Sequence, residues 1–329
     1  MSRMSMKVTR RRALTIIGGA LLAAATYLML SWPFKKEEKK VLPPREGRKN
    51  PYISNGRPVV VVAEGGDGSE LVDRAIERLG GLDKLVRSGD TVVVKPNVGF
   101  PYPEATVSPE VVAEVVRLAL DAGAAEVIVA ESAVRGSDTN YCFDRTGIRE
   151  AAEKAGAKVI DLKREGSRVW IRLPDPSLLG EVEVYREVYE ADVLVSVAKM
   201  KRHVDATVTL GMKNLIGAFP DMWKGYFHNK GINRAIAEIT AMLKPDLVVI
   251  DGTEAMLERG PTGGRMVELG IVVASGDPVA ADTVGASRIF EAEGVDEPWS
   301  IAVKVPHIVD AVKLELGVSA EDEMELVKV

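Results

Sequence analysis

A cluster of nitrogen-bearing side chains follows one strongly apolar stretch, from Val193 to Ala198. Apolar neighbours such as Leu210 and Phe219 are interspersed with it. Nitrogens beside apolar residues suit the binding of an anion or the transfer of a proton. The cluster therefore predicts where a functional site lies, without naming a substrate. Its members are Lys199, Lys201, His203, Lys213, Asn214 and His228.

Alternate residues at the start of this cluster share one side of the chain. In extended backbone Lys199, Lys201 and His203 point the same way, because side chains alternate with a period of two. Two ammonium groups beside an imidazole attract a carboxylate or a phosphate. Their mutual repulsion also lowers the pKa of a lysine toward that of a general base.

Polar residues follow several of the apolar runs, including the one described above. They are Lys95, Asn97, Glu131, Lys199 and Asp251. If these runs are parallel strands, the residues meet at one edge of a sheet, where open α/β sheets bind ligands. A strand can also end in a polar residue simply because it reaches solvent, but several such ends together favour a site. Asp282, one turn into a helix that Asp277 and Pro278 open, could face the same site.

A glycine-rich segment, residues 258–265, can bring backbone amides close to an anion at Gly260 and Gly263. It lacks the GK[ST] ending of a phosphate loop. The sequence fits both a flexible turn and a lid over a ligand. A divalent metal on His203 and His228, with Glu131, Asp251 or Asp277 as further ligands, is also possible. Neither histidine lies in a compact motif such as HExxH, so a hydrogen-bonding or acid-base histidine is favoured.

The elements that position these residues follow from hydrophobic patterning. β-Branched runs alternate with segments of helical spacing, which predicts a mostly parallel open α/β sheet with helices on both faces. Residues 167–187 predict a small β-hairpin insertion, and residues 296–329 predict terminal helices. The strand runs are 59–62, 92–94, 127–129, 159–160, 193–197, 247–250 and 271–273, and the helical segments are 71–79, 109–122, 148–155, 232–243 and 278–290.

Composition limits the class of protein. The chain has 329 residues, and 46% of them are hydrophobic, enough for a sizeable core. Without the five basic residues that precede Phe34, the body has 38 basic and 48 acidic residues, which argues against broad nucleic-acid binding. The lone Cys142 excludes an iron-sulfur cluster held by this chain alone. The lack of glutamine and the many charged residues predict a thermostable protein.

The amino terminus predicts export or anchoring in the cell membrane. Residues 9–14 (TRRRAL) resemble a twin-arginine signal, and residues 13–34 contain no charge. As a helix these 22 residues would span about 33 Å, enough to cross a bilayer. A cleaved signal is the alternative, but an uncleaved anchor with the body on the extracytoplasmic side is preferred. Residues 35–57 then predict a charged, proline-containing tether to a single α/β body, residues 58–329.

Several phrases of the chain resemble the family known as domain of unknown function 362, over about residues 91–290. The phrases are VVVKPN, ADVLVSVAKMKRH, LGMKNLIG, KGYFH, VVIDG, RGPTGG and GDPVAAD. That family is defined by sequence rather than by a reaction, so the resemblance implies a fold and a site more than an activity. Many relatives carry ferredoxin-type cysteine clusters, which this chain lacks. For this chain, the resemblance therefore implies an electron-transfer role only with a partner protein that supplies the iron-sulfur cluster.

Together these observations predict an exported or membrane-anchored enzyme that performs acid-base or group-transfer chemistry on a small carboxylate or phosphate. A serine hydrolase is disfavoured because there is no GxSxG motif. The alternatives are a tethered protein that binds an anion or metal without turnover, and an accessory protein to an iron-sulfur enzyme. The predicted catalytic residues are Lys199, His203, His228 and Asp251. The predicted substrate-binding residues are Lys95, Asn97, Glu131, Lys201, Lys213, Asn214, Gly260, Gly263 and Asp282.

Overall fold

The computed structural model describes residues 39–329. The strands are β1 (Val41–Leu42), β2 (Ile53–Ser54), β3 (Arg57–Glu64), β4 (Thr91–Pro96), β5 (Glu126–Glu131), β6 (Lys158–Asp161), β7 (Arg168–Arg172), β8 (Glu181–Tyr185), β9 (Val193–His203), β10 (Thr207–Thr209), β11 (Leu247–Leu257), β12 (Arg265–Ser275) and β13 (Glu325–Lys328). The helices are α2 (Gly68–Leu79), α3 (Pro109–Asp121), α4 (Thr139–Arg145), α5 (Ile148–Lys154), α6 (Arg186–Tyr189), α7 (Gly211–Asn214), α8 (Asp221–Leu243), α9 (Pro278–Ala292), α10 (Pro298–Ala302) and α11 (Pro306–Lys313).

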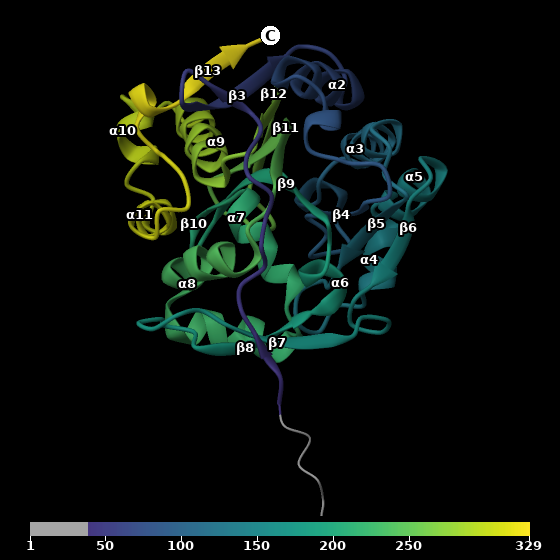
Figure 1. Cartoon of the computed structure of the whole chain (residues 1–329). Coiled ribbons are helices and arrows are strands. Elements are labelled where there is room, and N and C mark those ends of the chain that lie inside the picture. Colours follow the sequence, from purple (N-terminus) through teal and green to yellow (C-terminus); the bar gives the residue numbers. More distant parts are fainter. Residues whose placement is uncertain (1–38) are drawn as a thin grey trace, which may run out of the picture. The chain divides into compact units, whose positions relative to one another are not determined.

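The β-branched runs form one large sheet (Figure 1). Within the described range it has ten strands in the order β13-β3-β12-β11-β9-β4-β5-β6, with β2 on β3 and β10 on β9. Neighbours from β11 to β6 pair in parallel, whereas β12 pairs antiparallel with both β11 and β3. The predicted mostly parallel open sheet is therefore confirmed.

Helices cover both faces of this sheet, because alternate strand residues face opposite cores. On β3, Val61 and Ala63 join the core under α2, α3 and α5, while Val60 and Val62 join the core under α8, α9 and α11. Figure 1 shows these two sets of helices on opposite sides of the strands. α9 begins where predicted, with the Asp277 side chain accepting from the Val279 and Ala280 amides. The predicted helices on both faces are thus confirmed.

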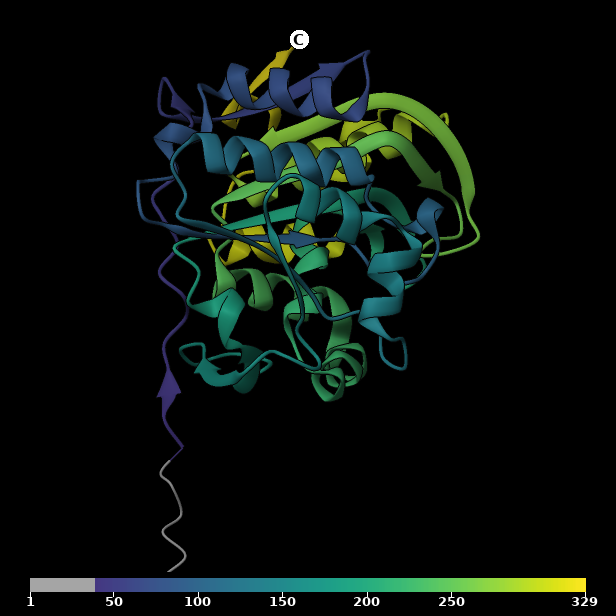
Figure 2. The same cartoon turned by 90° about the vertical axis from the view of Figure 1, so that its right-hand side faces the viewer.

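The strand β9 is longer than its apolar run. It continues from Val193 through the basic residues to His203, because β10 folds back against it in an antiparallel pair. β11 and β12 also extend beyond the sheet as a long hairpin, which Figure 2 shows as a curved arm. Lys199, Lys201 and His203 therefore lie within a strand rather than after one, whereas the rest of the predicted cluster lies on α7 and α8.

The predicted hairpin insertion is present as β7 and β8, which pair antiparallel, and β1 adds to β7 in parallel.

The segment predicted as a tether, residues 35–57, is not a free spacer from residue 40 onward, because these residues pack against the body. Arg45 is buried and donates to Asp246 Oδ2 at 2.6 Å and to the carbonyl of Ala191 at 2.9 Å. Tyr52 is also buried. Hydrogen bonds of Arg45 therefore fix this segment to the body, unlike a solvated spacer.

The carboxyl-terminal segment is only partly helical. α10 and α11 form as predicted, but residues 325–328 form β13, which pairs in parallel with β3 at the edge of the sheet. Four residues with charges at both ends give little periodic signal, which is why the sequence did not reveal this strand.

The predicted signal or anchor, residues 1–34, lies outside the described residues. From residue 39 onward, the structure has no helix that is both long and apolar enough to span a membrane.

Candidate functional site

A cavity of about 390 Å³ lies beyond the carboxyl ends of β4, β5 and β9. Open parallel sheets bind ligands at this edge. β9, β10, α7, α8 and the loops after β4 and β5 contribute to its wall. Its apolar lining includes Phe100, Val134, Val204, Ile216 and Pro261. Five of the predicted site residues line it: Asn97, Lys201, His203, Lys213 and His228.

The charges on this wall are mostly positive. Among described residues, four lysine or arginine side chains line the cavity, against one carboxylate, Asp205. The four are Arg135, Lys201, Lys213 and Lys224. An apolar wall strengthens the field of these groups because it excludes water. The cavity therefore favours a ligand that combines a negative charge with an apolar portion.

His203 is held as a neutral imidazole. Its Nδ1 accepts from the backbone amides of Asp205 at 3.1 Å and Ala206 at 3.3 Å, so the ring proton resides on Nε2. Burial, together with the charges of Lys213 and Lys201, lowers the pKa of His203 to about 2. His203 therefore remains neutral at physiological pH and can donate one hydrogen bond from Nε2.

His228 has the opposite arrangement. It lies one turn after Lys224 on α8, and its Nδ1 is 2.8 Å from the carbonyl oxygen of Lys224. A carbonyl only accepts, so Nδ1 carries the proton and Nε2 of the neutral ring has a free lone pair. Nε2 is 4.0 Å from Asp205 Oδ2, and the side chain is 41% exposed. His228 can therefore accept a proton, with Asp205 stabilising the resulting imidazolium.

Two lysines of the predicted cluster reach the cavity with lowered pKa values. Lys201 is buried on β9 and donates to the carbonyl of Ala105. Burial and the neighbouring Lys213 and Lys199 lower the pKa of Lys201 to about 7. Burial lowers the pKa of Lys213 to about 8, opposed by Asp205. An anion bound here would favour the charged form of both lysines.

A smaller cavity of about 80 Å³ adjoins the first at its inner end. Glu131 and Asn214, both predicted site residues, line it. Thr209 lines both cavities and is 2% exposed, yet its Oγ1 has no hydrogen-bond partner within residues 39–329. Asn97 Oδ1 is likewise unpartnered there. Buried polar atoms are usually hydrogen-bonded, so both atoms are suited to contact a ligand or water.

Lys95 supports the site from behind rather than lining it. Its Nζ donates to Glu131 Oε2 at 2.5 Å, to the carbonyl of Pro96 at 2.9 Å and to Asn214 Oδ1 at 3.4 Å. Burial lowers the pKa of Lys95, and the Glu131 carboxylate opposes this shift. A Cβ on Gly217 would lie 2.1 Å from Glu131 Oε1, so only glycine fits over this ion pair. The predicted substrate-binding role of Lys95 is not supported.

Lys199 and Asp251 are not placed for the predicted catalytic roles. They are direct neighbours on the parallel strands β9 and β11, and Lys199 Nζ is 3.4 Å from Asp251 Oδ2. Asp251 also accepts from Ser108 N and Oγ, each at 2.8 Å, and from Thr253 Oγ1 at 2.6 Å. Both side chains are buried and neither lines the cavity. This carboxylate instead holds the start of α3 against β11.

Asp282 is also a structural residue. It is fully buried on α9 and accepts from the Gly211 amide at 2.7 Å and the Met212 amide at 3.0 Å. These are the first amides of α7, so Asp282 fixes the short helix that presents Lys213. Burial raises the pKa of Asp282 to about 7. Asp282 lines neither cavity and is placed to position α7.

The glycine-rich segment is the turn of the β11–β12 hairpin. The carbonyl of Gly260 accepts from the Val204 amide at 3.2 Å, and a Cβ on Gly260 would lie 1.6 Å from the carbonyl oxygen of Arg202. The segment contributes Pro261 to the cavity wall, whereas Gly260 and Gly263 do not line it. The predicted anion contacts from these two glycines are therefore not formed.

The possible metal ligands do not gather. In the part of the chain that the structure describes, no group of three His, Cys, Asp or Glu side chains is placed to hold a metal ion. Glu131 is paired with Lys95, and Asp251 with Lys199 and Ser108. Asp277 caps α9. The two histidines therefore lack the carboxylate ligands that the sequence suggested.

The lining residues that were not predicted include Arg135, Lys224 and Thr209. Arg135 lies in the loop after β5 and makes no hydrogen bond or ion pair with residues 39–329. Lys224 donates to Ser132 Oγ at 2.5 Å and to the carbonyls of Ser132 and Ala133, both at 2.7 Å. Thr209 lies opposite Lys201 in the β9–β10 pair. Lys224 could have been identified because it precedes His228 by one helical turn.

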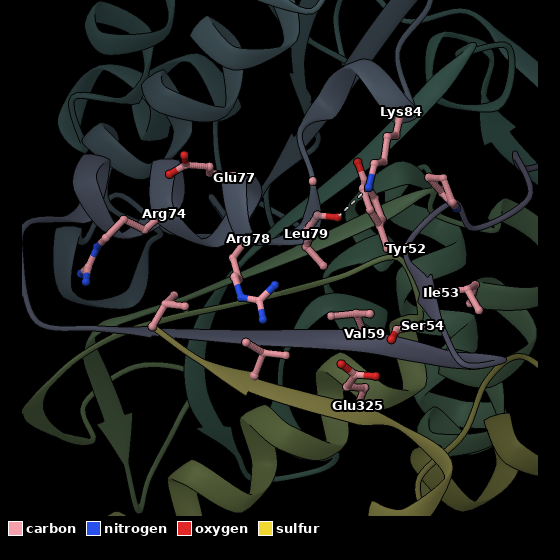
Figure 3. A pocket seen from close by; sticks show the side chains of 14 residues that line it. Tyr52, Ile53, Ser54, Val59, Arg74, Glu77, Arg78, Leu79, Lys84 and Glu325 are labelled. Atoms are coloured by element: carbon pink, nitrogen blue, oxygen red, sulfur yellow. Dashed lines mark hydrogen bonds between the residues drawn. The ribbon is translucent and has the colours of Figure 1, made fainter.

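A second hollow, of about 650 Å³, lies at the edge of the sheet formed by β2, β3 and β13, against α2 (Figure 3). α2 contributes Arg74, Glu77 and Arg78, and β13 contributes Glu325. None of the predicted site residues lines it. It is larger than the first cavity, but its mixed charges and lack of histidine give it no comparable chemistry, so the smaller cavity is the candidate site.

Comparisons with known proteins identify the family of the chain. A family model described as Domain of unknown function (DUF362) matches residues 92–287, from β4 into α9. The chain is 31% identical over 218 residues to the Thylakoid-associated protein sll1697 of Synechocystis sp., covering 64% of this chain and 66% of that protein. The match therefore spans slightly less than two thirds of the relative's length. The family match includes the cavity-lining lysines and both histidines, and the chain belongs to the DUF362 family, a domain of unknown function.

Proposed function

We propose that this protein is an enzyme that moves a proton on a small carboxylate bearing an apolar group. The observation that carries the proposal is the opposite protonation of two imidazoles at one cationic cavity. His228 offers an unprotonated Nε2, whereas His203 offers an Nε2 proton. A base and a neutral donor of this kind suit proton abstraction from the carbon next to a carboxylate.

The roles of the cations follow from this chemistry. Removal of that proton places negative charge on the carboxylate oxygens, and hydrogen-bond donors aimed at developing charge lower the barrier. Arg135, Lys201 and Lys213 would attract the carboxylate, and His203 would donate a hydrogen bond to the oxygen on which the added charge develops. The apolar lining would receive the rest of the substrate. Isomerase and lyase reactions both begin with this step.

The test uses mandelate, which has a carboxylate, an apolar ring and a hydrogen on the carbon between them. In D2O, the wild type should exchange that hydrogen for deuterium, which proton NMR detects. His228→Gln should slow the exchange by about 10²–10⁴-fold. His203→Asn keeps an acceptor for the Asp205 and Ala206 amides but removes the Nε2 donor, so it should also slow exchange.

Binding is measured separately with benzoate, which cannot exchange. His228→Gln should bind benzoate, whereas Lys213→Met should bind it weakly. Lys84→Met, in the other hollow, is the control. Benzoate binding without mandelate exchange would favour a binding protein over an enzyme. Equal benzoate affinity in the wild type and Lys213→Met would refute the site.

We further propose that the protein acts at a membrane. The support is the uncharged segment 13–34, with the twin-arginine-like TRRRAL before it, and the name of the thylakoid-associated relative. Cell fractionation should find the full chain with the membranes and a chain that begins at residue 39 in the supernatant. The same distribution for both chains would contradict an anchoring role for this segment.

A further inference from the structure

The amine of Lys213, a half-buried side chain, differs from the buried amines of Lys95 and Lys224. Lys224 has four oxygen partners and Lys95 has three. Lys213 Nζ, in contrast, makes no hydrogen bond or ion pair with any residue from 39 to 329, although it lines both the main cavity and its inner extension. Its nitrogen is therefore available to a ligand.

The surroundings of Lys213 favour the unprotonated amine. Val134 and Ile216 form an apolar wall of both cavities. Lys201 lies so close to Lys213 that the charge of Lys213 lowers the pKa of Lys201. Asp205, the carboxylate on the main cavity wall, is exposed, so solvent weakens its attraction. A lysine that is desolvated and beside another cation is an activated nucleophile. The pKa of about 8 for Lys213 agrees with this environment.

We propose that Lys213 is a nucleophile that forms a Schiff base with an oxo-carboxylate whose carbonyl group adjoins the carbon that loses its proton, which names the substrate class of the proposed function and rests on it. The amine nitrogen bonds to the carbonyl carbon, and one nitrogen proton moves to the carbonyl oxygen. A second proton, from solvent or protonated His228, allows the carbon–oxygen bond to break, and water leaves. The product is a protonated C=N group, which can accept electrons from an adjacent carbanion.

The placement of the other cations agrees with this assignment. Arg135, at the exposed edge of the cavity, and Lys201, on β9, can bind the carboxylate while Lys213 attacks the carbonyl. Lys201 is the less suitable nucleophile, because its Nζ already donates to the carbonyl of Ala105. His203 can donate a hydrogen bond from Nε2 to the carbonyl oxygen as negative charge develops there, without losing its proton.

The test is reductive trapping with benzoylformate and sodium cyanoborohydride. Benzoylformate has no hydrogen next to its carbonyl, so trapping does not depend on the proton transfer of the proposed function. Intact-mass measurement should show one reduced adduct per chain, and peptide mapping should place it on Lys213. Benzoate should compete with it.

Two variants separate the possible explanations. Lys213→Arg keeps a cation that can bind benzoate but cannot form a Schiff base, so its adduct should be lost. Lys84→Met should be trapped like the wild type. An adduct spread over surface lysines, or one that persists in Lys213→Arg, would overturn the proposal. No adduct in a wild type that still binds benzoate and exchanges mandelate would reject the nucleophile but leave the proposed function standing.

Discussion

Binding of a carboxylate should draw protons from solution above neutral pH. The reason is that Lys201 and Lys213 have pKa values of about 7 and about 8 in the free protein. At pH 8, about 0.9 of the Lys201 side chains and about 0.5 of the Lys213 side chains are then neutral. An anion at the cavity favours the charged form of both groups. Complete protonation would consume about 1.4 protons per anion bound.

The assay is isothermal titration of benzoate in buffers of different ionisation enthalpy. The slope of the measured enthalpy against that ionisation enthalpy gives the number of protons taken up. At pH 6 both lysines are already charged, so the number should fall to about 0.1. Lys213→Met should lose at least about 0.5 proton at pH 8, because it also removes a charge that lowers the pKa of Lys201, whereas Lys84→Met should behave as the wild type.

One result would refute this reasoning. If benzoate binds at pH 8 with no dependence on the buffer, the two lysines do not change protonation on binding, and the anion does not contact them. His228→Gln guards against a false positive, because uptake that disappears in this variant would belong to the imidazole rather than to the lysines.

Three further predictions concern positions that support the site. Gly217→Ala should destabilise the protein by about 3 kcal/mol in urea unfolding, because the added methyl displaces the buried carboxylate of Glu131. The pKa of Asp282 is raised from 3.8 to about 7, so the folded state alone keeps this proton between those values, and stability falls as pH rises through them. The free energy of unfolding of Asp282→Asn should therefore fall by about 4 kcal/mol less than that of the wild type between pH 4 and pH 7. The same pH dependence in both proteins would contradict this. Arg45→Ala should cost about 3–5 kcal/mol in thermal or urea unfolding, because it leaves Asp246 without its guanidinium partner, whereas a solvated tether would tolerate it.

The parts of the site that the sequence predicted depend on strand periodicity. Lys201 and His203 lie two residues apart on β9, and both line the cavity, as a period of two requires. The parallel arrangement also placed Asn97 and Glu131 at the same edge of the sheet. The position of these residues at one edge of the sheet could be predicted because it needed only strand direction and alternation, which apolar runs reveal.

The failures arise where the direction of a side chain depends on a neighbouring strand. Lys199 and Asp251 each follow an apolar run, but their strands are adjacent and in register, so the two side chains meet each other. Nothing in either run specifies that pairing. Arg135 was missed because it belongs to an irregular loop, where no periodicity indicates which side chain turns toward a cavity.

The lysines around the cavity show why residue type alone could not separate structure from function. Burying an amine is costly unless oxygen atoms compensate it, and Lys95 and Lys224 are compensated by three and four oxygens. These amines hold loops together and have little capacity left for a ligand. Lys213 lies on the same wall as Lys224 but has no such partners among residues 39–329, so its desolvation remains uncompensated in the free protein. A bound carboxylate would compensate it. The number of oxygen neighbours, rather than the spacing of lysines in the sequence, therefore distinguishes the amine that a substrate can use.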